Sequence, residues 1–109
     1  MKPNCEAMVR YVLPAIRAMI ARDLIEGHNM TQKEAAKKLG MTQPAVSQYG
    51  KHIRGNRAKI LERDQNISDK ISKISNSLAR GEIDINEATD KVCEICKYMR
   101  KKGLVKKII

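Results

Sequence analysis

Apolar residues recur three and four positions apart along most of the chain, which predicts amphipathic α-helices. Alternating apolar and polar positions, the pattern of half-buried strands, are absent from the sequence. The first helical stretch runs from Cys5 to Glu26, with Pro14 inside it and Gly27 after it. Because proline lacks an N–H and clashes one turn back, we expect a short helix and then a longer one, or a kink, with Gly27 as the stop. The expected fold class is all-α.

A capping box marks the start of the next helix. In Thr31-Gln32-Lys33-Glu34 the threonine hydroxyl can accept the amide of Glu34 while the glutamate side chain reaches back. This helix is expected to stop at Gly40. A second helix, capped by Thr42, then begins and is expected to end at Gly55. A helix, a glycine turn and a second helix therefore follow one another closely.

Two narrow aliphatic stripes occupy the C-terminal half of the chain. The first is expected to be divided near Asn66 or Ser68 and to end at Gly81. A capping box from Asp84 to Glu87 starts the second helix, which is expected to end at Gly103. Such stripes need an apolar partner, so they form either a dimer interface or a contact with each other within one chain. Their members are Ile60, Ile67, Ile71, Ile74 and Leu78 in the first and Ala88, Val92, Ile95 and Met99 in the second.

The charge is distributed unevenly along the chain. It totals +10 at pH 7, and residues 31–63 hold eight lysines and arginines against two acidic residues, whereas residues 64–96 hold four against seven. Residues 97–109 have six basic residues and no acidic one. A basic block beside an acidic one indicates a patch that meets a polyanion and a separate stretch that faces protein.

Composition narrows the class of protein further. Hydrophobic residues make up 42% of the chain, but Phe and Trp are absent and Tyr occurs three times, so the core must be aliphatic. One small domain, or a domain with an appendage, fits 109 residues. No apolar run approaches the roughly 20 residues that span a bilayer, and the first residues lack the layout of a secretion signal. We expect a cytoplasmic protein without a membrane partner.

The segment from residue 31 to residue 55 predicts a DNA-binding helix-turn-helix. Ala36 must be small where the two helices cross, and Gly40 takes the backbone angles of the turn. The wedge between the helices is expected to be filled by Leu39, Met41, Val46 and Tyr49. We therefore predict a DNA-binding domain at residues 1–57 and a helical C-terminal extension, for dimerisation or sensing, at residues 58–109.

The second helix of this motif carries the candidate DNA contacts. With Val46 and Tyr49 turned inward, its leading polar side chains face outward. Glutamine can bond adenine with both amide atoms, and serine can pair with several base edges. The expected base-reading residues are Thr42, Gln43, Ser47 and Gln48. The expected phosphate-binding residues around them are Lys33, Lys37, Lys38, Lys51, His52, Arg54 and Arg57.

Residues 32–55 resemble the helix-turn-helix of phage-repressor and Cro-like transcriptional regulators, with a small residue, a turn glycine and a buried valine at Ala36, Gly40 and Val46. The whole chain resembles a group of archaeal predicted transcriptional regulators. The residues that carry this wider resemblance are Cys5-Glu6 before the domain and Cys93-Glu94-Ile95-Cys96 after it. The resemblance implies a repressor-type fold and a role in the control of transcription.

The three cysteines leave several interpretations open. Cys93 and Cys96 lie three apart on one helical face, a spacing compatible with zinc or an iron–sulfur cluster. Cys5 would supply a third ligand, and His28 or His52 a fourth. The same cysteines can instead pack as small hydrophobes beside the second stripe, or act as a reversible thiol switch. DNA binding is expected to require no cofactor, and a bound cluster would sense oxygen or iron by changing the dimer.

The leading hypothesis is a sequence-specific transcriptional regulator that binds double-stranded DNA as a homodimer, since one helix-turn-helix covers too few bases for strong selectivity. A helical protein-interaction module, such as an antitoxin or a co-regulator scaffold, is the alternative. Catalysis is not expected, because the sequence has no glycine-rich phosphate loop, no paired-carboxylate pocket and no second histidine-bearing motif. The scarcity of aromatic residues argues against a single-stranded RNA target.

Overall fold

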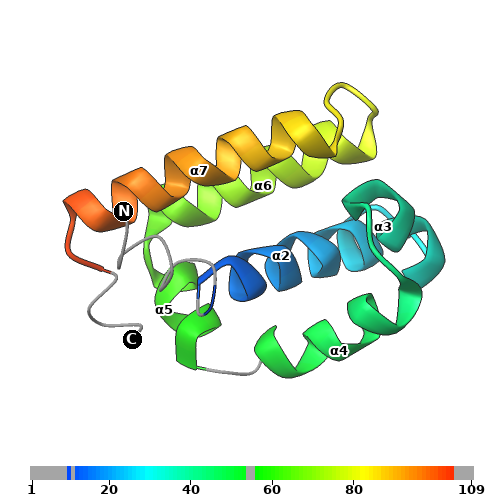
Figure 1. Cartoon of the computed structure of the whole chain (residues 1–109), viewed down its shortest axis with the longest axis horizontal. Coiled ribbons are helices and arrows are strands. Elements are labelled where there is room, and N and C mark those ends of the chain that lie inside the picture. Colours follow the sequence, from blue (N-terminus) through cyan, green and yellow to red (C-terminus); the bar gives the residue numbers. More distant parts are fainter. Residues whose placement is uncertain (1–9, 11, 54–55, 105–109) are drawn as a thin grey trace.

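The computed structural model describes residues 10, 12–53 and 56–104, with only the backbone of residues 49–53 and 56–57 (Figure 1). Each element in these ranges is helical, so the all-α prediction is confirmed. The order is α2 (Leu13–Arg22), the π-helical turn η2 (Asp23–Gly27), α3 (Gln32–Leu39), α4 (Gln43–Ile53), α5 (Asn56–Arg63), α6 (Gln65–Ala79) and α7 (Ile85–Lys101). None of these helices is long and apolar enough to cross a membrane.

Helix α2 lies at the centre of the fold. It packs against α4, α5 and α6, and Figure 1 shows it between the α6–α7 pair and α4. Ile16, Met19 and Ile20 of α2 are almost fully buried. One cluster of buried side chains runs through all the helices from α2 to α7. Because burial of one Ile or Met side chain contributes roughly 1.5–3 kcal/mol, these α2 residues hold the N-terminal and C-terminal parts of the molecule together.

Pro14 marks the start of a helix. Helix α2 begins at Leu13, and Pro14 lies in its first turn, where proline is well tolerated. Arg10 and Val12, before this helix, are π-helical. The chain then passes into η2, which ends at Gly27 as the sequence predicts. The stretch before Leu13, and with it the short first helix expected there, lies mostly outside the described residues.

Helices α5 and α6 meet at Asp64. The predicted break at Asn66 or Ser68 is therefore wrong, because the observed break lies earlier in the chain. The Asp64 carboxylate accepts the N–H of Ile67 at 3.2 Å and thereby caps α6. It also accepts the hydroxyl hydrogen of Tyr98, with 3.0 Å between the oxygens. The last turns of α7 are therefore tied to the corner between α5 and α6.

The two aliphatic stripes are buried within one chain. Helices α6 and α7 lie side by side and antiparallel, joined by a short turn, and α2 packs over α6 (Figure 1). The interpretation of these stripes as a dimer interface is therefore wrong, and their closure on each other within the chain is confirmed. Ile60, at the start of the first stripe, is half-buried at the edge of the core. The members that are at most 6% exposed are Ile67, Ile71, Ile74, Leu78, Ala88, Val92, Ile95 and Met99.

Polar contacts join segments that are distant in the sequence. The hydroxyl of Ser75, a residue of α6 that is 1% exposed, lies 3.0 Å from Asp23 Oδ2 and 2.9 Å from the Ile71 carbonyl oxygen. Arg22, at the end of α2, forms an ion pair with Glu62 of α5. A buried hydroxyl without a partner costs about 1–3 kcal/mol, so Ser75 helps to fix η2 against α6.

Tyr98→Phe should lower the free energy of unfolding by about 1 kcal/mol, because the hydroxyl bonds to Asp64 and Asn66 are lost while the ring remains. Urea unfolding followed by circular dichroism measures the change. In an Asp64→Ala background the same substitution should cost at most about half as much, because the acceptor is already gone. Equal costs in the two backgrounds would show that the bond between Tyr98 and Asp64 contributes nothing.

Candidate nucleic-acid interface

Helices α3 and α4 are joined by a tight turn at Gly40. The backbone of Gly40 is left-handed, with φ of +67°, and the N–H of Met41 donates to the Ala36 carbonyl at 2.9 Å. A side chain at position 40 would have space, since the atom nearest to an added Cβ is 3.8 Å away on Ile85. The positive φ, rather than crowding, therefore favours glycine here.

Small and aliphatic side chains fill the wedge between α3 and α4. Ala36, Leu39 and Val46 are 3%, 6% and 4% exposed, and Met41 is half-buried against the same core. These parts of the predicted helix-turn-helix packing are confirmed, whereas the side chain of Tyr49 lies outside the described residues. Because α4 also packs along α2, its outer face is held at a fixed angle to the body of the protein.

Both helices of the motif begin at capping threonines. Thr31 Oγ1 accepts the Glu34 N–H at 3.1 Å and Glu34 Oε1 accepts the Thr31 N–H at 3.0 Å, which confirms the capping box. The bond from the Thr31 N–H, together with the contact to the Thr31 side chain, lowers the pKa of Glu34 from its ordinary value. At the start of α4, Thr42 Oγ1 accepts the N–H of Ala45 at 3.3 Å. The hydroxyl of Thr42 is thus already engaged in capping α4.

The predicted base-reading residues lie together at the outer edge of the first turns of α4. The described part of this helix runs to Ile53, and the expected stop at Gly55 lies outside the described residues. Val46 faces the core, so the residues around it face solvent. Base reading by these residues stays a prediction. The exposed residues of this edge are Thr42, Gln43, Ser47 and Gln48.

The predicted phosphate-binding lysines of α3 lie on two different surfaces. Lys33 and Lys37 are exposed and line, with Gln43, a groove of about 510 Å³. Lys38 is half-buried and lines, together with Lys37, an adjoining cavity next to the turn between α6 and α7. Phosphate binding by any of the seven basic residues stays a prediction. The four whose side chains lie outside the described residues are Lys51, His52, Arg54 and Arg57.

The cysteines of α7 lie apart from other metal-binding side chains in the described part of the chain. Cys93 is exposed, and Cys96 is half-buried against the core, as expected for a small hydrophobe. Cys5 lies outside the described residues. Among the residues that the structure does describe, no three His, Cys, Asp or Glu side chains could hold a metal ion. His28 instead forms a hydrogen bond through Nε2 to Asn76 Oδ1 at 2.8 Å. A metal centre and a thiol switch both stay predictions.

Sequence reasoning missed the cavity that Lys38 lines. Its other walls come from Met30, the end of α6 and the start of α7, which are far apart in the sequence. Hydrophobic periodicity describes one helix at a time, so no local pattern could have brought these segments together. The adjacent pair Lys37-Lys38 was the only available signal, and it indicates a basic patch rather than a cavity.

Comparison with protein families agrees with the geometry of α3 and α4. A family model described as helix-turn-helix, of the Cro/C1 type, matches residues 22–49, from the end of α2 into α4. The chain thus carries a helix-turn-helix of a kind found in DNA-binding regulators of transcription. The match stops before Cys93, so the wider resemblance to archaeal regulators stays a prediction. No curated protein and no solved structure matches the chain.

Ala36→Leu should lower the free energy of unfolding by about 1–3 kcal/mol, because a larger side chain overpacks the space between α3 and its neighbours. Gln32→Leu introduces leucine at an exposed position of the same helix and should change that free energy by less than about 0.5 kcal/mol. Denaturant titration of both variants measures the difference. If the two variants unfold alike, the small size of Ala36 does not matter to the helix pair.

Proposed function

We propose that this protein is a sequence-specific regulator of transcription that binds double-stranded DNA and places the start of α4 in the major groove. The observation that carries the proposal is the exposed polar edge of α4 on a helix-turn-helix with a small buried Ala36 and a left-handed Gly40. The family match over residues 22–49 supports the same function. In this proposal the protein has no catalytic role and acts in the cytoplasm.

The amides of Gln43 and Gln48 are the strongest base-reading candidates. Each can accept a hydrogen bond from N6 of adenine and donate one to N7, and such a bidentate contact discriminates by roughly 1–3 kcal/mol. Ser47 can pair with several bases. Thr42 contributes less, since its hydroxyl already caps α4. Most of the sequence preference is therefore assigned to the two glutamines.

Basic side chains beside this edge supply the electrostatic part of the proposed binding. Lys33 and Lys37 flank the groove next to Gln43, and each lysine that meets a phosphate releases condensed counterions from the DNA. In the proposal, four further basic residues follow the polar edge and meet the same backbone. These residues are Lys51, His52, Arg54 and Arg57.

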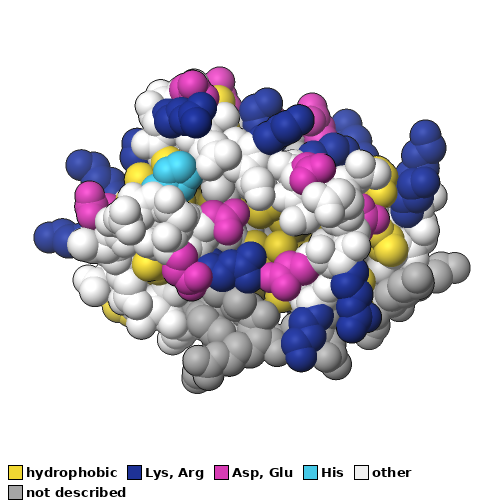
Figure 2. All heavy atoms as spheres, turned by 180° about the vertical axis from the view of Figure 1, so that it is seen from behind, with side chains coloured by type: hydrophobic (Ala, Val, Ile, Leu, Met, Phe, Trp, Pro, Cys, Tyr) yellow, Lys and Arg dark blue, Asp and Glu magenta, His cyan; other side chains and the backbone are white. Residues whose placement is uncertain are grey.

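We further propose that two copies of the chain bind one operator. A dimer reaches two half-sites about 34 Å apart on one face of the duplex. The stripes of α6 and α7 are buried within one chain, so contact between copies must use other surfaces. On the face shown in Figure 2, apolar side chains form only small patches between charged ones. A dimer that assembles on the DNA through a small protein interface fits this surface.

Selection of bound duplexes from a random library should yield a two-fold symmetric consensus whose half-sites lie about one helical turn apart. Sedimentation should then find two protein chains on each selected duplex. An asymmetric consensus with one chain per duplex would exclude the dimer and leave the regulator standing. Enrichment of no sequence at all would contradict the proposed function and favour a protein-interaction module.

Gln43→Ala and Gln48→Ala should each remove about 1–3 kcal/mol of discrimination at one base position and leave the salt dependence of binding unchanged. Lys37→Ala should weaken binding to every duplex and reduce the slope of log K against log salt concentration by about one unit. Fluorescence anisotropy at several salt concentrations measures both effects.

Lys91→Ala is the matched control for the lysine variant. Lys91 is exposed on α7, a helix that lies on the opposite side of α2 from α4 (Figure 1). Its removal should leave the salt slope unchanged. Glutamine and lysine variants that behave alike would show that the division into base-reading and phosphate-binding residues is wrong.

A further inference from the structure

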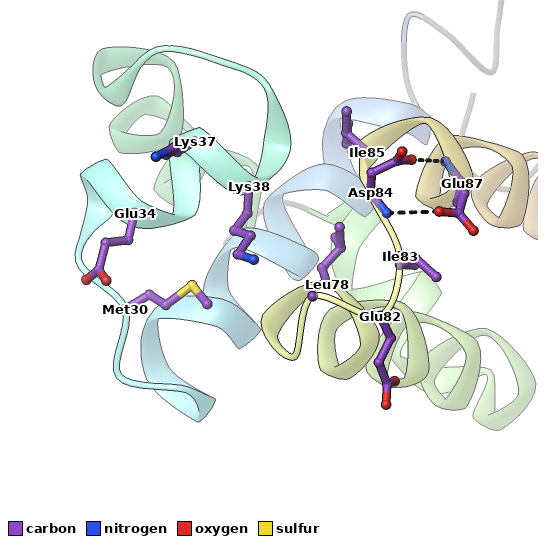
Figure 3. Close-up of a pocket in the computed structure, with 11 residues that line it drawn as sticks. Met30, Glu34, Lys37, Lys38, Leu78, Glu82, Ile83, Asp84, Ile85 and Glu87 are labelled. Carbon is purple, nitrogen blue, oxygen red and sulfur yellow. Dashed lines mark hydrogen bonds between the residues drawn. The ribbon is translucent and has the colours of Figure 1, made fainter.

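A cavity of about 760 Å³ separates α3 from the turn between α6 and α7. One wall is formed by α3 and Met30, and the other by Leu78, the turn and the start of α7 (Figure 3). Helix α3 packs mainly on α2, η2 and α4, so it leaves this space open. The volume lies within the roughly 300–1,000 Å³ that is typical of pockets for small molecules.

Apolar side chains line the inner part of the cavity. Leu78 is 1% exposed, and Met30, Ile83 and Ile85 are half-buried against the same core. These four side chains come from the segment before α3, the end of α6, the turn and the start of α7, and they offer a surface for an apolar molecule of modest size. Burial of apolar surface would supply most of the affinity of such a molecule.

Three of the four carboxylates that line the cavity are already engaged. Glu34 belongs to the capping box of α3. Asp84 accepts the N–H of Glu87 at 2.9 Å and Glu87 accepts the N–H of Asp84 at 3.3 Å, as drawn in Figure 3. Each of the three lies at a helix N-terminus, where the positive end of the helix dipole partly offsets its charge. The fourth carboxylate, that of Glu82, is directed away from Lys38 in Figure 3.

Lys38 is the half-buried charged residue of the cavity lining, whereas the other charged residues of the lining are exposed. Figure 3 shows its side chain extending from α3 toward Met30 and Leu78. It is half-buried, and no described residue forms a hydrogen bond or an ion pair with it. An ammonium group that has no ion pair and lies beside apolar side chains gains from a carboxylate partner, since charge-assisted hydrogen bonds are the strongest available to it.

We propose that this cavity binds a small carboxylate with an apolar body. The carboxylate pairs with Lys38, and the body packs against Met30, Leu78 and Ile83. Lys37 also lines the cavity and adds a second positive charge, while three of the four carboxylates in the lining are held in helix caps. A molecule bound there contacts α3 of the helix-turn-helix and the turn between α6 and α7 at the same time.

Titration of the full chain with octanoate, followed by methyl NMR, tests this site. We expect saturable shifts at the methyl groups of Met30, Leu78, Ile83 and Ile85. In Lys38→Gln the dissociation constant should rise by about fivefold to tenfold, which is the loss of one charge-assisted contact. Lys33→Gln, an exposed lysine on the same helix that does not line the cavity, should bind octanoate as the parent protein does.

Octylammonium, a probe of opposite charge, is titrated into the parent protein, so this comparison needs no variant. Weaker binding of octylammonium than of octanoate supports the assignment. Three results would overturn it: equal affinity of the Lys38→Gln and Lys33→Gln proteins for octanoate, tighter binding of octylammonium, or shifts that do not saturate. No DNA is present in these titrations, so their failure leaves the proposed function standing, and a failure of DNA binding leaves this site standing.

Discussion

Burial of α2 from several sides is the constraint on which the other contacts of this molecule depend. Helix α4 lies along one side of α2 and α6 along another, so the same side chains, among them Ile16 and Met19, hold both the helix-turn-helix and the C-terminal pair. The contacts of Ser75 with Asp23 and of Arg22 with Glu62 act at the end of this helix. Because α2 cannot shift without losing apolar contacts on both sides, the exposed edge of α4 keeps one orientation relative to α6 and α7.

Local signals in the sequence predicted where α3, the first helix of the helix-turn-helix, begins and where it ends. The capping box of Thr31 and Glu34 acts across three residues, so the neighbouring sequence contains all the information that sets it. The positive φ of Gly40 is likewise a property of one residue. The exposed face of α4 followed from the helical period once Val46 was placed inside. These parts of the fold and of the candidate interface could be predicted without knowledge of the rest of the chain.

Features that depend on distant segments could not be predicted in this way. Asp64 caps α6 without a glutamate at the position of Ile67, so it carries no capping-box signal, and its bond to Tyr98 joins it to another helix. An apolar stripe shows that a helix needs a partner and does not show which one, so the choice between a second chain and α7 remained open. Ile71 of α6 and Ile95 of α7 are buried in the same core, so the two stripes pack together within this chain.

The adjacent lysines of α3 show how a short helix can serve two surfaces. Successive residues of an α-helix are rotated by about 100°, so neighbouring side chains cannot project in the same direction. Lys37 lines the groove beside Gln43 as well as the rim of the cavity, whereas Lys38 is half-buried toward the turn between α6 and α7. In the sequence the two lysines form one basic pair. On the folded helix, an anion at Lys38 and a phosphate at Lys37 would lie on neighbouring flanks of α3. A displacement of α3 caused by one ligand would therefore change the surface offered to the other.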